Sequence, residues 1–598
     1  MRLDTGGIQQ TDNLEFQLLR VLDLHNLRIE TLPSSIGGLV HLRYLDLSEN
    51  PVTELPASIT QLQNLQTLKL NRCWKLKVLP ADVKKLINLR HLDLGGHDGL
   101  GSCLDLASMP AGMGRLIALH KLDVFIVGID HRASVSETKT ARLRDLKALD
   151  KLSGRLRIKI LGEMKYPVNE AKEANLSSKH GLSELLLEGK HDEAVLDGLQ
   201  PPRNLRKLAI RDYRGQRLPT WASMDSLNCS IPNLVVVELE DWGSCLNVPL
   251  FSRLRSLKRL RLYSLKSVEY MENSRYDASS SSSSTSFFPS LEELQLWDMD
   301  KLKSWWWMEA GAAVDAGQRT SSSTSSTEVQ PQHIQPSFFP RLLKLEIGGC
   351  PSPKSIPLCP NVEELQLVRV NKELRVLTTV VMPREGASRL KTMRIADIGG
   401  LISLPTDCLR GLTSLTIGDS KLLDLSSLAE VFRSLSSLES LRIHGCNGLR
   451  SLHGGLEHLS SFKKMEIQFC EQLDLSAEDK EIGMPWKALK GLQSLMLDSI
   501  PKVLVLPDGL QHLTALRLLY IMFNYELMTI PEWINCLGSL ELLQITYCPK
   551  VKTLPEGIRF LTSLKNFDIY GCSGLTERCR GPNGDDWPKI QHIPKVSV

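Results

Sequence analysis

Cysteine is the residue type in this chain best suited to chemistry, because its thiolate can bind a metal ion or act as a nucleophile. The 598-residue sequence contains thirteen cysteines, and no two of them form a Cys-x-x-Cys pair. That spacing is typical of zinc sites and redox centres, so its absence argues against both. Several cysteines instead follow a short apolar segment at a fixed offset, which two asparagines also occupy. The residues at this offset are Asn50, Cys73, Cys350, Cys446, Cys470, Asn524, Cys548 and Cys572.

A small polar side chain at such a position can turn inward and bond to backbone groups that a tight bend leaves without partners. The sequence therefore predicts a structural role for these cysteines.

Other motifs that carry chemistry are absent. The sequence has no GxxxxGK[ST] loop to cradle phosphates and no GxSxG nucleophile motif. The glycine-rich stretch 95–101 lacks a lysine, and His453 and His458 do not have the spacing of a helical zinc pair. We therefore expect no enzyme activity, no catalytic residue, no metal site and no cofactor.

The elements that position these residues are short repeats. In the stretch 32–50, apolar residues follow one another in steps of three and then of two, as in Leu42-x-x-Leu45-x-Leu47. Steps of two place leucines on one face of a strand, and steps of three suit a 3₁₀-like return. The LxxLxL pattern begins at Leu19, Leu42, Leu65 and Leu89, at intervals of 23, 23 and 24 residues.

This period is typical of leucine-rich repeats, in which each turn is too small to bury its own leucines and must stack on its neighbours. The predicted fold is an α/β solenoid, a leucine-rich-repeat horseshoe with a parallel β-sheet on the concave face. Its returns are expected to be short 3₁₀, irregular or helical segments.

Breaks in the period divide the chain. We expect regular repeats over 1–127 and an irregular return with a helix over 128–155. Middle repeats over 156–303 contain a serine-rich insert at 278–286, and a low-complexity loop follows over 304–338. C-terminal repeats occupy 339–573. Residues 574–598 form a cap, in which Trp587, Ile590 and Ile593 cover the last turn.

Composition limits the function classes. The formal net charge is +4, from 72 basic and 68 acidic residues, which argues against nucleic-acid binding through bulk charge. The sequence shows no apolar run long enough for a membrane span and no secretory signal at Met1. We therefore expect a cytoplasmic protein with free thiols and without a membrane span.

A binding function must then come from strand residues that point away from the leucines. Strands near Leu205 and Leu257 are basic, whereas those near Leu291 and Val362 are acidic. Trp305-Trp306-Trp307 is either an exposed docking patch or a cluster packed under the serine-rich insert. Near the C-terminus the face becomes aromatic, which favours a protein interface. The candidate protein-binding residues are Tyr520, Met522, Phe523, Gln544, Tyr547, Asp568 and Tyr570.

Several longer stretches carry a family resemblance. LRVLDLHNLRIETLPSSIGGLVHLRYLDLSEN at 19–50, AKEANLSSKHGLSELLLE at 171–188 and LTERCRGPNGDDWPKIQHIP at 575–594 are three of them. The chain resembles the leucine-rich-repeat region of plant intracellular nucleotide-binding disease resistance proteins, of the cereal-type coiled-coil class. The resemblance covers nearly the whole chain. The signalling and nucleotide-binding domains that precede the repeats in such receptors have no counterpart in this sequence, which therefore resembles a truncated product, an alternative transcript or a partial gene model.

The resemblance implies a non-catalytic recognition and autoregulatory module of an innate immune receptor. Its protein ligand would be a pathogen effector or a modified host protein, and the receptor's nucleotide-binding domain would be an intramolecular partner. Candidate residues for that intramolecular contact are Arg43, Lys69, Arg90 and Lys121. The alternative is a free-standing leucine-rich-repeat scaffold that bridges host proteins without an immune role.

Overall fold

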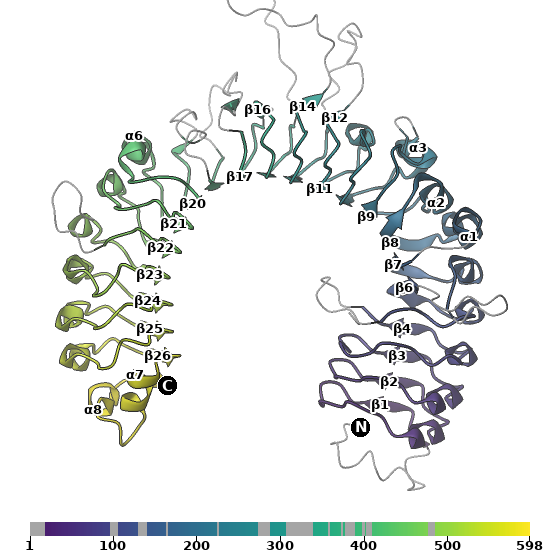
Figure 1. Ribbon diagram of the computed structural model, residues 1–598, viewed down its shortest axis with the longest axis horizontal. Helices are drawn as coiled ribbons and strands as arrows, with labels where there is room; N and C mark the ends of the chain where they lie inside the picture. The colour runs from purple at the N-terminus through teal and green to yellow at the C-terminus, as the bar shows by residue number, and fades with distance from the viewer. Residues whose placement is uncertain are drawn as a thin grey trace, which may run out of the picture. The chain divides into compact units, whose positions relative to one another are not determined.

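The computed structural model describes residues 18–95, 106–128, 140–162, 166–223, 226–272, 288–306, 339–356, 359–371, 375–376, 389–396, 401, 409–475 and 485–598. The chain forms two compact units, residues 1–336 and 337–598. Within each unit, parallel strands lie along the concave side and helices along the convex side (Figure 1). The predicted fold class, a leucine-rich-repeat solenoid with a parallel sheet, is confirmed.

The strands of the first unit form two main parallel sheets. One contains β1 (Val21–Asp23), β2 (Tyr44–Asp46), β3 (Thr67–Lys69), β4 (His91–Asp93) and β5 (Lys121–Leu122). The other contains β6 (Val124–Val127), β7 (Ser153–Ile160), β8 (Gly181–His191), β9 (Lys207–Tyr213), β10 (Val236–Glu240), β11 (Arg259–Tyr263) and β13 (Glu293–Trp297). A small pair contains β12 (Tyr270–Glu272) and β14 (Ser304–Trp306).

The second unit repeats the same arrangement. Its parallel sheet contains β15 (Lys344–Gly348), β17 (Glu364–Val368), β19 (Thr392–Ile395), β20 (Ser414–Gly418), β21 (Ser440–His444), β22 (Lys464–Gln468), β23 (Ser494–Asp498), β24 (Leu518–Met522), β25 (Leu542–Thr546), β26 (Asn566–Tyr570) and β27 (Lys595–Ser597). A second pair contains β16 (Ser355–Ile356) and β18 (Arg375–Val376).

Steps of three in the sequence become steps of three in the hydrogen bonding. The N–H of Ile36 donates to the carbonyl of Pro33 at 3.2 Å, that of Leu39 to Ile36 at 3.1 Å, and that of Leu42 to Leu39 at 2.9 Å. These i→i+3 bonds define a 3₁₀-helix, η3 (Ser34–Gly38), as the spacing predicts. Each apolar residue in this series is buried, so the return supplies the convex half of the core.

Most other returns are 3₁₀-helices of the same kind, and a few are short α-helices. In the first unit they are η4 (Ala57–Gln61), η5 (Val83–Lys85), η6 (Met113–Arg115), η7 (Leu143–Ala148), α1 (Pro167–Ala174), η8 (Leu176–Ser178), α2 (Glu193–Gly198), η9 (Thr220–Ala222), α3 (Leu227–Ser230) and η10 (Phe251–Arg253). In the second unit they are η11 (Ser426–Leu428), α6 (Ala429–Ser434), η12 (Leu456–His458), η13 (Trp486–Ala488), η14 (Asp508–His512), η15 (Glu532–Cys536) and η16 (Glu556–Phe560).

The leucines of the strands stack in register. Leu22 pairs with Leu45, Leu45 with Leu68, and Leu68 with Leu92, and the last three side chains are fully buried. Each leucine therefore fills the space beside the leucine of the next turn, which removes from water the apolar surface that a single repeat cannot cover.

The inward-turning polar position also behaves as predicted. The Oδ1 of Asn50 accepts hydrogen bonds from the N–H of Leu27 at 2.9 Å and of Ile29 at 3.0 Å, while its Nδ2 donates to the carbonyls of Leu24 and Leu47 at 2.8 Å each. A cysteine at this position also bonds to the backbone, since the Cys73 thiol donates to the Leu47 carbonyl at 3.2 Å. Both side chains are fully buried.

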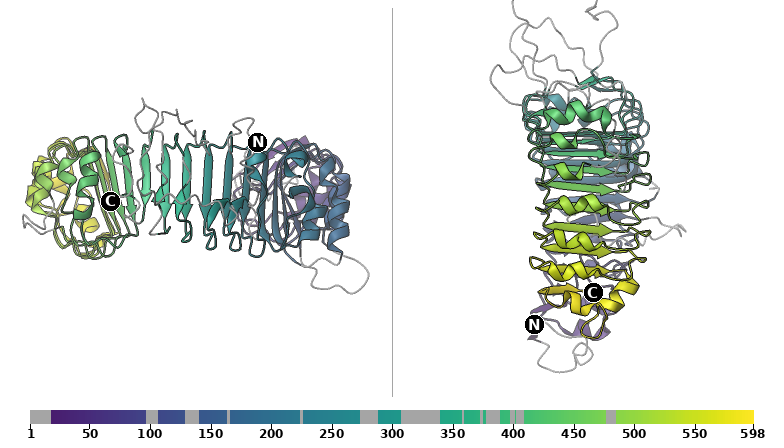
Figure 2. Two further views of the ribbon diagram at one scale, coloured as in Figure 1. Left: turned by 90° about the horizontal axis from the view of Figure 1, so that it is seen from above. Right: turned by 90° about the vertical axis from the view of Figure 1, so that its left-hand side faces the viewer.

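The residues after β26 cover the last repeat with two short helices and a strand. Helices α7 (Ser573–Cys579) and α8 (Trp587–Ile590) close the last turn, as the right-hand view of Figure 2 shows. Ile590 and Ile593 are buried, and Trp587 is partly buried. The chain then adds β27 beside β26, so the last full repeat does not present an open sheet edge. The apolar spacing of the tail did not predict this strand.

Two range predictions differ from the structure. Strand β14 occupies 304–306, inside the range predicted as a low-complexity loop, because Ser304 and Trp306 pair with β12. Strand β7 begins at Ser153, inside the predicted irregular return, whose helix is the 3₁₀-helix η7. The serine-rich insert 278–286 and residues 307–338 lie outside the described residues.

Candidate functional site

An aromatic cluster lies at the end of the last strands. The rings of Phe523 and Tyr547 stack with centroids 4.7 Å apart and planes 9° apart, and Tyr570 meets Tyr547 edge-on at 5.3 Å. Tyr547 is 37% exposed and Tyr570 is 64% exposed. Partly exposed aromatic rings held by one another are typical of the anchor residues of protein interfaces.

A backbone feature positions these rings. Phe523 and Tyr547 each follow the last residue of a strand and have left-handed φ angles of 52° and 53°. In this conformation the N–H of Phe523 still donates to the carbonyl of Thr546, at 2.9 Å, and that of Tyr547 to Tyr570, at 2.7 Å. The turn therefore preserves the ladder while it moves the side chain from the face of the sheet to its edge.

The other C-terminal candidates occupy the face itself. Tyr520, Gln544 and Asp568 are in register as the middle column of β24, β25 and β26. Met522 and Tyr570 belong to the next column, with the buried Thr546 between them. The structure thus brings Phe523, Tyr547 and Tyr570 into ring contact and places the remaining candidates beside them on the same three strands.

One aromatic residue of this edge was missed. Phe469 follows β22, has a left-handed φ of 53°, is 49% exposed and packs edge-on against His444 with centroids 5.3 Å apart. The sequence does carry a signal for it. An aromatic residue directly precedes the inward-turning Cys or Asn in Phe469-Cys470, Phe523-Asn524 and Tyr547-Cys548.

The basic candidates of the first unit do not form one patch. Arg43 and Arg90 are exposed and lie in one column at the start of the strands, with Gln66 between them along the ladder. Lys69 and Lys121 lie in other columns, where Lys69 is 3.3 Å from the Asp46 carboxylate and Lys121 is 3.9 Å from Asp93. Within the described part of the chain, Arg43 and Arg90 have no ion-pair partner, whereas Lys69 has one and Lys121 has two, Asp93 and Asp123.

Neighbouring carboxylates hold Lys69 and Lys121 in ion pairs. Asp46 also accepts a hydrogen bond from the Tyr44 hydroxyl at 2.9 Å, and the Lys69 ammonium lies 5.3 Å from the centre of the Tyr44 ring. Burial, together with a hydrogen bond to the Asp93 carboxyl, raises the pKa of Asp123 to about 7. At neutral pH, the Asp123 carboxyl therefore carries a proton for part of the time.

The alternating basic and acidic strands of the middle repeats neutralise each other. Arg261 lies 3.1 Å from Glu293 on the next strand and 3.4 Å from Glu238 on the preceding one. Lys207 pairs with Glu238 at 2.9 Å, and Lys258 with Glu292 at 2.8 Å. Because these charges satisfy one another across the sheet, this part of the face does not present a surface of one sign.

Trp305 of the tryptophan run is buried, with 4% of its surface exposed. It lies in β14, which pairs with β12 on the return side of the repeats. Trp305 is therefore not part of an exposed docking patch, and the insert under which it was predicted to pack lies outside the described residues. The side chains of Trp306 and Trp307 lie outside the described residues.

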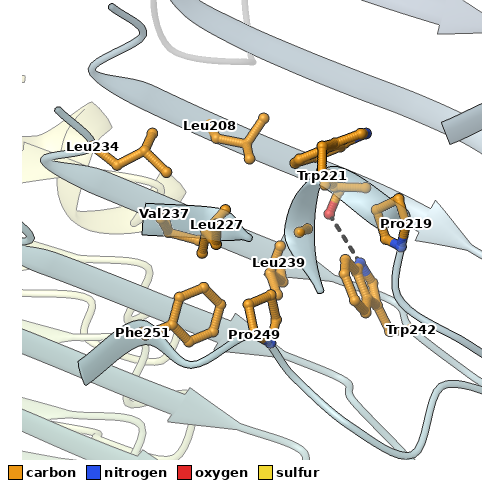
Figure 3. A pocket seen from close by; sticks show the side chains of 12 residues that line it. Leu208, Pro219, Trp221, Leu227, Leu234, Val237, Leu239, Trp242, Pro249 and Phe251 are labelled. Atoms are coloured by element: carbon orange, nitrogen blue, oxygen red, sulfur yellow. Dashed lines mark hydrogen bonds between the residues drawn. The ribbon is translucent and has the colours of Figure 1, made fainter. Parts of the chain in front are cut away.

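The pocket drawn in Figure 3 lies inside the repeats of β9 and β10 and is lined by apolar side chains. The two indole N–H groups at its wall are already used, since Trp221 donates to the Leu196 carbonyl at 2.9 Å and Trp242 to the Ile210 carbonyl at 3.4 Å. The lining therefore offers packing and no polar group for catalysis. The residues are Leu208, Ile210, Pro219, Trp221, Ala222, Leu227, Leu234, Val237, Leu239, Trp242, Pro249 and Phe251.

Cys73 and Cys470 of the ladder are held as thiols, whereas a hydrogen bond with the Cys548 thiol lowers the pKa of Cys572. Burial raises the pKa of Cys73 to about 11 and that of Cys470 to about 12. A thiol that stays protonated is a poor nucleophile and a poor metal ligand. In the described part of the chain, no group of three or more His, Cys, Asp or Glu side chains is arranged to hold a metal ion. Among the described helices, none has the length and apolar character that a membrane span needs.

Comparisons with known proteins agree with this repeat architecture. Over 446 residues the chain is 30% identical to RGA1, a candidate disease resistance protein of Solanum bulbocastanum, which corresponds to 73% of this chain and 37% of that protein. It is 36% identical over 299 residues to the disease resistance protein RGA2 of the same species, covering 48% of this chain and 29% of the relative. The chain thus spans about a third of the length of the curated relatives it matches.

Among solved structures, the plant peptide hormone receptor RGFR1 in complex with RGF2 matches 97% of this chain and 90% of its own, with 15% identity and a TM-score of 0.34. The family model described as a leucine-rich repeat region matches residues 5–313. Because that match covers more than half of the sequence, the chain belongs to the leucine-rich repeat region family, and its curated relatives are plant disease resistance proteins.

Proposed function

We propose that this chain is the non-catalytic protein-recognition and autoregulatory module of a plant innate immune receptor. Its ligand is a pathogen effector or a modified host protein, and it works in the cytoplasm. The observation that carries the proposal is the aromatic cluster of Phe523, Tyr547 and Tyr570, which lies exposed on a chain whose relatives are named disease resistance proteins.

The cluster suits recognition of a protein. Aromatic side chains lose little conformational freedom on binding and bury a large area, so they supply most of the affinity in many interfaces. Here the rings already hold one another, which lowers the entropy cost of association further. The neighbouring Gln544 and Asp568 provide polar groups that select the partner by hydrogen bonding.

Autoregulation is assigned to the first repeats. Arg43 and Arg90 are exposed and have no ion-pair partner among the described residues, so their charge is available to an acidic surface. In a receptor that carries a nucleotide-binding domain before the repeats, we assign these arginines to the contact with that domain. Lys69 and Lys121, which already pair with carboxylates, contribute less to that contact.

A receptor assay tests both assignments. The chain is placed behind a nucleotide-binding domain, expressed in plant cells and scored for cell death with and without pathogen challenge. The double change Tyr547→Ala with Tyr570→Ala should abolish the response and leave the resting state quiet. The double change Arg43→Glu with Arg90→Glu should release restraint and cause cell death without challenge.

Phe560→Ala is the matched control, because Phe560 is equally exposed at 67% but lies in η16 on the convex side. This variant should respond as the unmodified receptor does. An intact response from the double tyrosine variant would overturn the assignment of the recognition surface. Restraint that survives the arginine changes would overturn the assignment of the regulatory contact.

A further inference from the structure

The concave face over the last full strands carries negative charge without a counterion. The outward-facing residues of β23, β24, β25 and β26 include two carboxylates, Asp498 and Asp568, and no lysine, arginine or histidine. Within the described residues, neither carboxylate has an ion-pair partner. Asp498 is only 6% exposed. It accepts a hydrogen bond from the Ser499 hydroxyl at 2.8 Å and a long one from the Gln468 amide at 3.5 Å.

Other carboxylates of the strands do have basic ion-pair partners. Glu466, one strand before Asp498, pairs with Arg442 at 3.1 Å and with Lys464 at 2.6 Å. In the first unit, Asp46 and Glu238 are likewise matched by basic side chains. A buried carboxylate without a countercharge costs folding free energy. Burial accordingly raises the pKa of Asp498, even though Ser499 and the more distant His444 and Arg442 act in the opposite direction.

The aromatic edge has a gap beside this carboxylate. Phe469, Ser499 and Phe523 occupy the same left-handed position on three successive strands, with φ angles of 53°, 54° and 52°. Strands two apart are separated by about 9.5 Å, and Ser499, between the two phenylalanines, carries no ring, so the row of aromatic residues is interrupted at this position. Tyr547 covers one face of the Phe523 ring by parallel stacking, which leaves the opposite face directed toward Ser499.

An unpaired carboxylate beside a free aromatic face is suited to bind an arginine side chain. A guanidinium is planar, always charged, able to donate two hydrogen bonds to a carboxylate and able to stack on an aromatic face. We propose that this gap receives an arginine of the protein ligand, paired with Asp498 and stacked on the free face of Phe523. The inference rests on the proposed function, since it names the chemistry of the partner that the aromatic edge recognises.

Binding of a defined peptide to the full chain tests the inference. The probe is fluorescein-labelled Gly-Arg-Gly-Arg-Gly, compared with the same peptide in which citrulline replaces arginine and so removes only the charge. We expect fluorescence anisotropy to show at least about ten-fold tighter binding of the arginine peptide. Asp498→Asn and Phe523→Leu should each remove most of that preference.

Asp508→Asn is the control, because it makes the same charge change in η14 on the convex side and should leave the preference intact. If Asp498→Asn does not fold, as thermal unfolding would show, Phe523→Leu decides alone. Equal binding of the two peptides, no binding at millimolar concentration, or equal losses in the Asp498 and Asp508 variants would overturn the arginine assignment. Those outcomes would not change the result expected from the receptor assay. An intact response of the Tyr547 and Tyr570 double variant in that assay would refute the proposed function itself.

Discussion

Replacing Asp586 with alanine is expected to destabilise the C-terminal cap by about 3–5 kcal/mol, the cost typical of breaking a buried charge network at one partner. Asp586 is fully buried. Its carboxylate accepts hydrogen bonds from the Leu554 N–H at 3.0 Å and from the Arg578 Nε at 3.1 Å, and it lies 3.0 Å from the Lys589 ammonium. It therefore joins the cap to the preceding repeat. Its loss would leave the Leu554 N–H without this acceptor and would leave Arg578 and Lys589 with only their other contacts, which include Asp585 and Glu556 respectively.

The pH dependence of this contribution has a defined sign. Burial alone would raise the pKa of Asp586, but hydrogen bonds from Arg578, the Leu554 N–H and Lys589 outweigh burial and hold it below its ordinary value. A depressed carboxyl pKa stabilises the fold above the unfolded-state pKa, and this contribution is lost as pH falls through the folded-state value. The difference between the unmodified chain and the alanine variant should therefore be full at pH 7 and shrink below about pH 4.

Chemical denaturation with hydrogen exchange of β25 and β26 measures the effect. Asp585→Ala is the control, since Asp585 is 73% exposed and contacts Arg578 at the surface, where a pair contributes about 0–1 kcal/mol. Equal exchange in the two variants would show that Asp586 does not hold the cap.

Leu45→Ala is expected to destabilise the first unit by about 2–5 kcal/mol. Leu45 is fully buried in the column between Leu22 and Leu68, so alanine would open a cavity in a close-packed stack. Because each repeat contacts only its neighbours, the damage should concentrate in β1, β2 and β3.

Val40→Ala provides the comparison within the same repeat. Val40 is 46% exposed on the convex side after η3, and substitutions of this kind usually change stability by less than about 0.5 kcal/mol. A thermal unfolding shift for Leu45→Ala no larger than that for Val40→Ala would contradict the register of the leucine column.

The parts of the fold that depend on local spacing were predictable. Steps of three at Ile36, Leu39 and Leu42 gave the 3₁₀ return, because the same spacing sets the i→i+3 bonds. The inward position of Asn50 followed from the backbone groups that a tight bend leaves without partners. Both inferences need only one repeat and its immediate neighbour.

The geometry of the candidate binding residues depends on contacts between strands and on backbone conformation, which local spacing does not show. Lys69 and Arg43 look alike in the sequence, but only Lys69 has a carboxylate opposite it on the preceding strand. The left-handed conformations of Phe523 and Tyr547 were not predictable, since no glycine marks them and bulky residues seldom adopt positive φ. The unpaired state of Asp498 likewise follows from what two neighbouring strands place beside it, at Gln468 and at Met522.

We propose that a protein partner contacts the C-terminal aromatic edge. Site-specific photo-crosslinking in challenged plant cells tests it most directly, with benzoylphenylalanine placed at Tyr570 in one variant and at Phe560 in the other. These positions are 64% and 67% exposed, so they differ in location and not in accessibility. We expect a challenge-dependent crosslinked protein from position 570 that is absent at position 560. Crosslinking to the same protein from both positions, or from position 560 alone, would contradict the claim.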